Sequence, residues 1–353
     1  MSARPDSLRG ATIVGTGMYV PDRVLTNADF ERMVDTSDEW IRERTGIRER
    51  RIAAPEQASS DLAVAAARRA LEAANMRPEE LDQIIVATTT PDHYLPSCAC
   101  TVQAKIGARK AAAYDVFAAC TGFIYGMGVV RGLIGAGLAD NVLLIGVETL
   151  SRIVDYTDRN TCVLFGDGAG AAVFQPCAPG DGILGVSLRS DGDLGHLLEI
   201  PSGGSAQPAS HETVEARGHV IKMRGKELFK VAVRGMEESL RLALESAGLG
   251  PGDLDLVIPH QANQRIIDAV CERLDVPREK VVLNIEYYGN TSSASIPLSL
   301  DEVVRAGRLA PGQNVGLVAF GGGATWGATV MRWTMPVPVQ ADHASAAVEN
   351  VGA

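Results

Sequence analysis

The sequence of 353 residues contains no run of eighteen apolar residues, and only 5% of its residues are aromatic. The missing run excludes a membrane-spanning helix, and the opening segment MSARPDSLRG lacks the apolar core of a signal peptide. The six cysteines follow no disulfide-like spacing, so a reducing cytoplasm is the expected location. We therefore expect a globular cytoplasmic protein without a membrane partner.

Charge and motif content remove further classes of protein. The net charge of −10 argues against nucleic acid as a partner. The sequence has no H-E-x-x-H or C-x-x-C metal motif and no Gly-rich loop with nucleotide-binding spacing. We expect neither a metal nor a bound cofactor. Apolar residues make up 46% of the chain, which is ample for a core.

An internal duplication organises the chain. ALEAANMRPEELDQIIV at 70–86 recurs as ALESAGLGPGDLDLVIP at 243–259, with seven of the first thirteen positions identical. The same offset of 173 residues, without a gap, aligns NVLLIGVE at 141–148 with NVGLVAFG at 314–321. The period is far longer than a solenoid repeat, so the sequence indicates two related domains.

Strand-like and helix-like patterns alternate along both halves, which is typical of parallel sheets covered by helices. Two such units stacked together predict an α/β fold, a five-layered α-β-α-β-α sandwich built from two duplicated halves. We expect the halves at 1–178 and 179–335, divided near the Pro/Gly-rich QPCAPGDG, and a loose tail at 336–353. The strands are expected at 11–20, 83–89, 112–117, 141–147, 168–174, 183–188, 256–259, 281–284, 314–319 and 327–335. The helices are expected at 60–75, 121–136, 225–247, 263–274 and 293–305.

Three polar residues follow apolar strand-like runs: Cys120, His260 and Asn290. Ligands of open α/β sheets collect at the carboxyl ends of strands, so these side chains are expected in one crevice. Cys120 lies where a helix begins, and the helix dipole and free N–H groups there predict a lowered thiol pKa. A buried structural cysteine is the alternative. The duplication sets His260 over Ala87 and Cys120 over Ser293, so the halves differ at these positions.

A Cys–His–Asn set fits two chemistries. In a protease-like triad the Asn orients the His, whereas in a decarboxylating condensation neutral His and Asn both donate to a thioester oxygen. AFGGGATWGA at 319–328 offers backbone N–H groups close to a ligand. The segment 222–234 carries five basic residues and one acidic residue, with Lys226, Lys230 and Arg234 on one helix face. That face is either solvated or a docking stripe for an acidic or phosphate-bearing partner.

At these residues the chain resembles β-ketoacyl-acyl-carrier-protein synthase III, a condensing enzyme of the thiolase superfamily, from about residue 10 to 334. The resemblance implies a thiolase-like fold. It is carried by ACTGF at 119–123, HQAN at 260–263, GN at 289–290, FGGGATWG at 320–327, TSDEWIRERTGIRER at 36–50, TDRNTCVLFGDGAGAAV at 157–173 and MRGKELFKVAV at 223–233.

The resemblance implies a reaction that initiates fatty acid synthesis. Cys120 takes the acyl group from a short acyl-CoA, and malonyl-acyl carrier protein then binds and loses CO₂. His260 and Asn290 stabilise the enolate oxygen, and the enolate attacks the acyl-Cys carbonyl. The oxyanion formed there lies between the N–H groups of Cys120 and Gly322.

The resemblance also implies binding residues. An acyl carrier protein would meet Lys230, Arg234 and Arg265, and Leu95 would enter the acyl pocket of a dimer partner. Leu95 stands where many relatives have Phe, which suggests room for a longer or branched acyl group. Asn160 and Lys226 depart from the residues usual in the family and put the affinity for CoA in doubt. The positions matching those that bind CoA or phosphopantetheine are Trp40, Arg44, Thr45, Arg159, Met223, Gly225, Phe229, Ala262 and Asn263.

Other functions stay open at this point. A synthase III-like acyltransferase of secondary metabolism would pass the Cys120 acyl group to another nucleophile without decarboxylation. Retained His260 and Asn290 argue against it. A degradative thiolase would need a second catalytic Cys in the last Gly-rich loop, and residues 320–326 offer none. A carrier-protein-binding module without catalysis is the third class.

Overall fold

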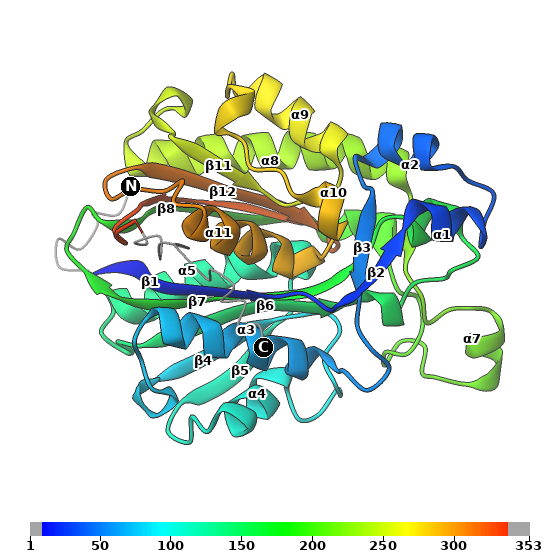
Figure 1. Cartoon of the computed structure of the whole chain (residues 1–353), viewed down its shortest axis with the longest axis horizontal. Coiled ribbons are helices and arrows are strands. Elements are labelled where there is room, and N and C mark those ends of the chain that lie inside the picture. The colour runs from blue at the N-terminus through cyan, green and yellow to red at the C-terminus, as the bar shows by residue number, and fades with distance from the viewer. Residues whose placement is uncertain (1–8, 338–353) are drawn as a thin grey trace, which may run out of the picture.

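The computed structural model describes residues 9–337, which form two stacked β-sheets with helices outside and between them (Figure 1). The predicted five-layered sandwich is confirmed. The tail expected at 336–353 lies, from residue 338 onward, outside the described residues. No helix in the described range is long and apolar enough to cross a bilayer.

The first sheet collects strands from the amino-terminal half, in the order β1-β7-β6-β4-β5. β4 pairs in parallel with β5 and β6, while β7 runs antiparallel to β1 and β6. β6 is buried along its whole length, which explains its continuous apolar sequence. The strands are β1 (Gly10–Tyr19), β4 (Gln83–Ala87), β5 (Ala112–Val116), β6 (Val142–Thr149) and β7 (Asp167–Cys177).

The second sheet repeats this order in the carboxyl-terminal half, as β8-β13-β12-β11. β11 and β12 pair in parallel, and β13 is antiparallel to both of its neighbours. The strands are β8 (Gly182–Ser190), β11 (Leu256–Pro259), β12 (Asn314–Gly321) and β13 (Thr325–Arg332). β7 ends and β8 begins on either side of the division expected at 178–179.

The strand predicted at 281–284 is wrong. Only Val281 pairs there, in a single parallel bridge to Val257. The Gln261 side chain then accepts hydrogen bonds from the N–H groups of Asn284 and Ile285, at 3.1 and 3.2 Å. Because these donors bind a side chain rather than a neighbouring strand, the chain leaves the sheet and forms the short helix α10 (Ile285–Tyr288).

Helices form the other three layers (Figure 1). α3 (Ser59–Ala73) and α4 (Cys98–Ile106) cover the outer face of the first sheet, and α8 (Gly225–Ala247) and α9 (Gln264–Arg273) cover that of the second. α5 (Gly122–Gly135) and α11 (Ser295–Arg305) lie between the sheets. α8 ends as predicted because Gly248 takes the left-handed conformation, with φ of 72°, that closes a helix.

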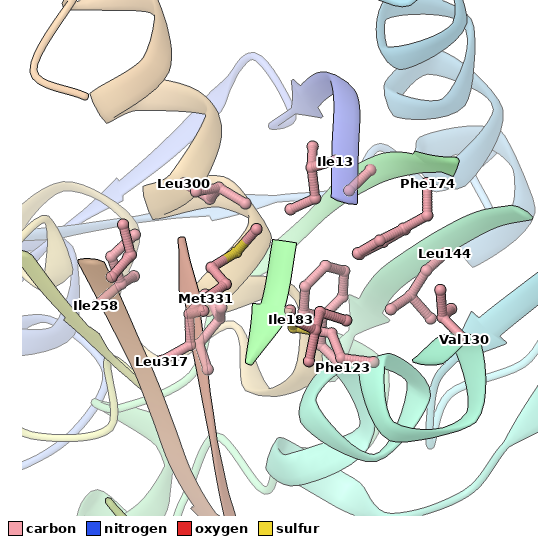
Figure 2. Close-up of a cluster of buried hydrophobic side chains, with 14 of the residues drawn as sticks. Ile13, Phe123, Val130, Leu144, Phe174, Ile183, Ile258, Leu300, Leu317 and Met331 are labelled. Atoms are coloured by element: carbon pink, nitrogen blue, oxygen red, sulfur yellow. The ribbon is translucent and has the colours of Figure 1, made fainter. Parts of the chain in front are cut away.

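The core between the sheets joins the two halves. Figure 2 shows Phe123, Leu144 and Phe174 of the first half near Leu317 and Met331 of the second. All five belong to one cluster of fully buried apolar side chains. Burial of this shared surface stabilises the two halves as one unit, because removing apolar area from water is the main favourable term in folding.

Smaller elements surround one end of the sandwich and were not anticipated from the sequence. They include the hairpin of β2 (Arg23–Thr26) and β3 (Glu49–Ile52), the two-stranded ribbon of β9 (Leu198–Glu199) and β10 (Lys222–Met223), and four short helices. The helices are α1 (Asn27–Glu31), α2 (Asp38–Thr45), α6 (Arg159–Cys162) and α7 (His211–Glu215).

Candidate active site

The structure places the three predicted residues at the ends of secondary-structure elements. Cys120 lies in a 3₁₀ turn between β5 and α5, His260 directly follows β11, and Asn290 follows α10. Their exposed fractions are 8%, 2% and 7%, respectively. Such burial favours strong interactions between these groups and a bound substrate, because little water competes.

One loop, residues 290–295, contacts all three positions. Its turn at 292–294 packs against the turn that holds Cys120, and hydrogen bonding by the Ser292 side chain opposes the rise in the pKa of the thiol. The Ser292 N–H donates to Asn290 Oδ1 at 2.9 Å. Further along, Ser295 Oγ lies 2.6 Å from His260 Nδ1. The loop therefore sets the positions of nucleophile, imidazole and amide relative to one another.

The hydrogen bonds of this loop fix the orientation of the Asn290 amide. A backbone N–H can only donate, so the atom that accepts from Ser292 is the carbonyl oxygen of the side chain. The backbone of Asn290 is held as well, by its N–H to Leu164 O at 2.8 Å and by Gly166 N–H to its carbonyl at 3.0 Å. The Nδ2 group is left as the donor of this side chain.

His260 is neutral and offers a donor. Burial lowers the pKa of His260 to about 3, because the charged imidazolium loses its hydration. Among the described contacts, Nδ1 is the acceptor available to the Ser295 hydroxyl proton, since the other group near that oxygen is Gln261 N–H at 3.4 Å. This arrangement puts the ring proton on Nε2. That atom is buried without a hydrogen-bond partner among residues 9–337.

The predicted lowering of the Cys120 pKa is wrong. Burial raises the pKa of the thiol to about 12, and the nearby Glu148 carboxylate acts in the same direction. Hydrogen bonds from Ser292 and from the Cys120 N–H oppose this shift without overcoming it. The helix start does lie beside Cys120, but removal of water from the thiolate dominates.

The Gly-rich turn after β12 packs against the turn that holds Cys120. A Cβ atom at Gly321 would lie 2.7 Å from the Cys120 nitrogen, so the approach requires glycine. The Thr325 hydroxyl donates to Ala118 O at 3.2 Å. Gly322, a predicted oxyanion-hole residue, directly follows Gly321 and so lies next to the turn that holds Cys120.

Residues matching CoA-binding positions gather on α2 and α6. The Arg159 guanidinium lies over the half-buried Trp40 ring at 5.0 Å from its centroid, and that of exposed Arg44 at 5.8 Å. Thr45 is different, because it is buried and its hydroxyl donates to Ile41 O at 2.6 Å and accepts from Ile47 N–H at 3.0 Å. Its side chain holds the end of α2.

The remaining CoA positions lie on neighbouring elements. Met223 is in β10, Gly225 begins α8, and Ala262 follows His260. The Asn263 side chain caps α9 through Arg265 N–H and donates to Arg44 O at 2.9 Å, which joins α9 to α2.

The predicted carrier-protein stripe is exposed. Lys230 and Arg234 lie on α8, and Arg265 is the second residue of α9. The Arg265 guanidinium lies 5.9 Å from the ring centroid of Phe229, one residue before Lys230, so the start of α9 lies beside the part of α8 that carries Lys230.

Leu95 is 88% exposed, next to Tyr94 at 90%. It does not reach the Cys120 site of its own chain by any described contact, so its role in an acyl pocket stays a prediction that requires a second subunit. No cluster of three or more His, Cys, Asp or Glu side chains in residues 9–337 is placed to bind a metal.

Three site residues were missed from the sequence: Ser292, Ser295 and Glu148. The serines lie in the run TSSAS that follows Asn290, and a run of hydroxyl residues beside a predicted catalytic Asn is a usable signal. Glu148 ends the apolar run NVLLIGVE, where a single carboxylate after a buried strand could have drawn attention.

A buried Cys–His–Asn set at the centre of this duplicated sandwich defines a thiolase-fold condensing enzyme. Residues 114–192 match the family model of 3-oxoacyl-[acyl-carrier-protein] synthase III, and residues 244–333 match the model of its C-terminal part. The chain belongs to the β-ketoacyl-acyl-carrier-protein synthase III family.

Relatives of known name agree with this assignment. The β-ketoacyl-[acyl-carrier-protein] synthase III of Desulfitobacterium hafniense is 57% identical over 91% of this chain and 97% of its own length. The crystal structure of 3-oxoacyl-[acyl-carrier-protein] synthase III from Aquifex aeolicus has a TM-score of 0.85 at 50% identity, covering 92% of this chain and all of that one. The enzyme from Pseudomonas aeruginosa gives 0.86 at 43% identity, with 94% and 100% covered.

Proposed function

We propose that the chain condenses a short acyl-CoA with malonyl-acyl carrier protein, with loss of CO₂, and so initiates fatty acid synthesis. The names of its relatives support this reaction. The observation that carries the proposal is the pair of neutral donors at the site. His260 Nε2 is buried without a hydrogen-bond partner in the described part of the chain, and Asn290 Nδ2 is left over once Oδ1 is engaged.

The first half-reaction acylates Cys120. The thiolate attacks the thioester carbonyl, CoA leaves as its thiolate, and the acyl group stays on sulfur. Backbone N–H groups of Cys120 and Gly322 would hold the oxyanion. Cys120 is held against the turn that precedes Gly322, which supports this assignment.

The second half-reaction forms the carbon–carbon bond. Malonyl-acyl carrier protein loses CO₂, and negative charge develops on its thioester oxygen. Neutral donors are suited to this oxygen, since each hydrogen bond strengthens as the charge develops. The enolate carbon then attacks the acyl-Cys carbonyl, and Cys120 leaves. In this reaction the chain needs no bound cofactor.

The surfaces around the site suit the two substrates. Trp40 and Arg159 would hold the adenine of CoA between them, and the guanidinium must move off the ring to admit it. Arg44 would meet a phosphate. Lys230, Arg234 and Arg265 would receive the acidic carrier protein.

A homodimer completes the proposal. β5 is the edge strand of the first sheet, and the exposed side chains of Phe117, Tyr94 and Leu95 lie in segments next to that strand and to α4. An unpaired strand beside exposed apolar groups favours pairing with a second copy. We place the enzyme in the cytoplasm, where its six free thiols would stay reduced.

Intact-mass spectrometry tests the proposal. The wild type and Cys120→Ala are incubated with acetyl-, propionyl-, isobutyryl- and hexanoyl-CoA, with and without malonyl-acyl carrier protein. We expect an adduct on Cys120 that disappears with malonyl-carrier protein and yields 3-ketoacyl product and CO₂. A persistent adduct would instead favour the acyltransferase, and no adduct a binding module. If all longer starters prime far worse than acetyl-CoA, Leu95 does not enlarge the pocket.

A further inference from the structure

Glu148 is a fully buried carboxyl group that the reaction described above leaves without a role. It is the penultimate residue of β6, with an exposed fraction of 0%. Its Oε2 accepts from Thr89 N–H at 3.1 Å and from the Thr90 hydroxyl at 2.7 Å, and its Oε1 from the hydroxyls of Ser292 and Ser293 at 3.1 and 3.2 Å. The first pair of bonds holds the carboxyl group to the segment after β4, and the second directs it to the 290–295 loop.

Acylation of Cys120 requires an acceptor for the thiol proton. Burial keeps the thiol protonated at neutral pH. His260 is poorly suited to accept, because its Nδ1 already accepts from Ser295 and its Nε2 carries a proton. The turn at 292–294 packs against the turn that holds Cys120, and Ser292 is the residue whose side-chain hydrogen bonding acts on the thiol pKa. A hydroxyl can pass a proton on only if a base follows it.

Ser292 connects the thiol to Glu148. Its single hydroxyl proton can point to only one of the two neighbours at a time. With a thiol at Cys120, the thiol donates to Ser292 and Ser292 donates to ionised Glu148. With a thiolate, Ser292 donates to sulfur and a protonated Glu148 donates to Ser292. Burial raises the pKa of Glu148, which brings its proton affinity closer to that of the thiol.

We propose that Glu148 is a positioning residue that holds the Cys120 proton during the catalytic cycle, passed through Ser292. During acylation, the thiol proton moves to Ser292 as the Ser292 proton moves to Glu148 Oε1. The Cys120 sulfur forms the thioester, and CoA departs as a thiolate that takes a proton from water. During condensation the Cys120 thiolate leaves, and the proton returns along the same path. The return of the proton during condensation rests on the proposed function, whereas the transfer of the proton during acylation does not.

The isosteric variant Glu148→Gln separates three models. Alkylation of Cys120 by iodoacetamide removes the same thiol proton as acylation, so losing the acceptor is expected to slow alkylation about tenfold at neutral pH. Acylation by acetyl-CoA, followed as the burst of CoA release, is expected to be about 100-fold slower, because the proton acceptor is gone. A bystander charge would make both reactions faster, because its loss favours the thiolate. A merely structural role would leave both reactions slow at every pH, whereas the proposal expects both to recover at high pH, where hydroxide takes the thiol proton. Either result would overturn the proposal.

Two further variants cover the case in which Glu148→Gln fails to fold. Glu148→Asp keeps the charge but withdraws it by one methylene, so alkylation and acylation are both expected to fall, by less than in Glu148→Gln. In Ser292→Ala the path is broken, and adding Glu148→Gln to it should slow acylation no further, which a double-mutant cycle measures. Additive losses would contradict the proposal. Iodoacetamide and acetyl-CoA probe acylation alone, so a failure to condense malonyl-carrier protein would reject the proposed function without affecting this inference.

Discussion

The two halves of the molecule share one topology but differ in the fifth strand. In the first half this strand is β5, at the free edge of its sheet; in the second it is reduced to the bridge at Val281. The chain freed in this way continues through α10 to Asn290. Loss of pairing in one half therefore supplies the loop that brings Asn290, Ser292 and Ser295 to the site.

The halves also contact each other through equivalent positions. At the offset of 173 residues, Ala119 corresponds to Ser292, and both have the left-handed backbone conformation that non-glycine residues rarely adopt, with φ of 46° and 49°. Glu148 corresponds to Gly321. Each lies at the end of a strand and touches the turn of the opposite half, Glu148 through its carboxylate and Gly321 through its bare backbone. Symmetric turns thus came to hold a nucleophile on one side and its supporting hydroxyls on the other.

The largest expected effect comes from making the end of β11 resemble the end of β4, where Ala87 stands. His260→Ala removes one of the two donors to the enolate oxygen. Condensation should slow about 100- to 1,000-fold, equivalent to about 2.7–4 kcal/mol. Release of ¹⁴CO₂ from labelled malonyl-carrier protein measures it. The acyl adduct on Cys120 should still form, since His260 does not take the thiol proton. Equal loss of acylation would show that the imidazole serves both steps.

A second test concerns the contact at Gly321. In Gly321→Ala the added Cβ would lie 2.7 Å from the Cys120 nitrogen, so the turn that holds Cys120 has to shift. We expect a loss of about 1–3 kcal/mol in the free energy of unfolding, typical of overpacking, together with slower acylation. Urea denaturation and the CoA burst measure these. Gly192→Ala is the matched control, because a Cβ there meets nothing within 4 Å. If both variants behave alike, the close contact is unimportant.

Sequence patterns predicted the fold, because the alternation of strands and helices follows from local rules. The bounds of α8 and β11 agree with the structure, and His260 directly follows β11 as expected, whereas Asn290 follows α10 rather than a strand. The prediction of a strand at 281–284 failed because the side chain of Gln261, distant in sequence, accepts the hydrogen bonds of the Asn284 and Ile285 N–H groups. The prediction of a lowered thiol pKa for Cys120 failed for a related reason. Helix position is visible in sequence, whereas desolvation of Cys120 depends on everything packed around it.

Acid sensitivity should reside in the second half. The pKa of His260 is about 3 in the folded protein and about 6.5 when unfolded, so the unfolded chain takes up this proton first as the pH falls. The contribution of neutral His260 to the free energy of unfolding is complete above about pH 6.5 and is lost as the pH falls towards 3. Between pH 7 and 5 the loss is about 2 kcal/mol. Urea unfolding should show this pH-dependent loss in the wild type and lack it in His260→Ala. An equal slope in both would contradict a buried neutral imidazole.

The smallest effect compares the two central helices. Gly132 of α5 corresponds to Arg305 of α11, which pairs with Asp301 at 2.6 Å. Gly132 is exposed, and a Cβ there meets nothing within 4 Å, so Gly132→Ala should stabilise the protein by up to about 1 kcal/mol through helix propensity alone. Gly126→Ala in the same helix is the control of opposite sign, because its Cβ would lie 2.4 Å from Leu144 Cδ1. Denaturation midpoints that move in opposite directions would show that α5 keeps glycine at 126 for packing against β6 but not at 132. A loss in both would mean that α5 requires its glycines for a reason other than close contact.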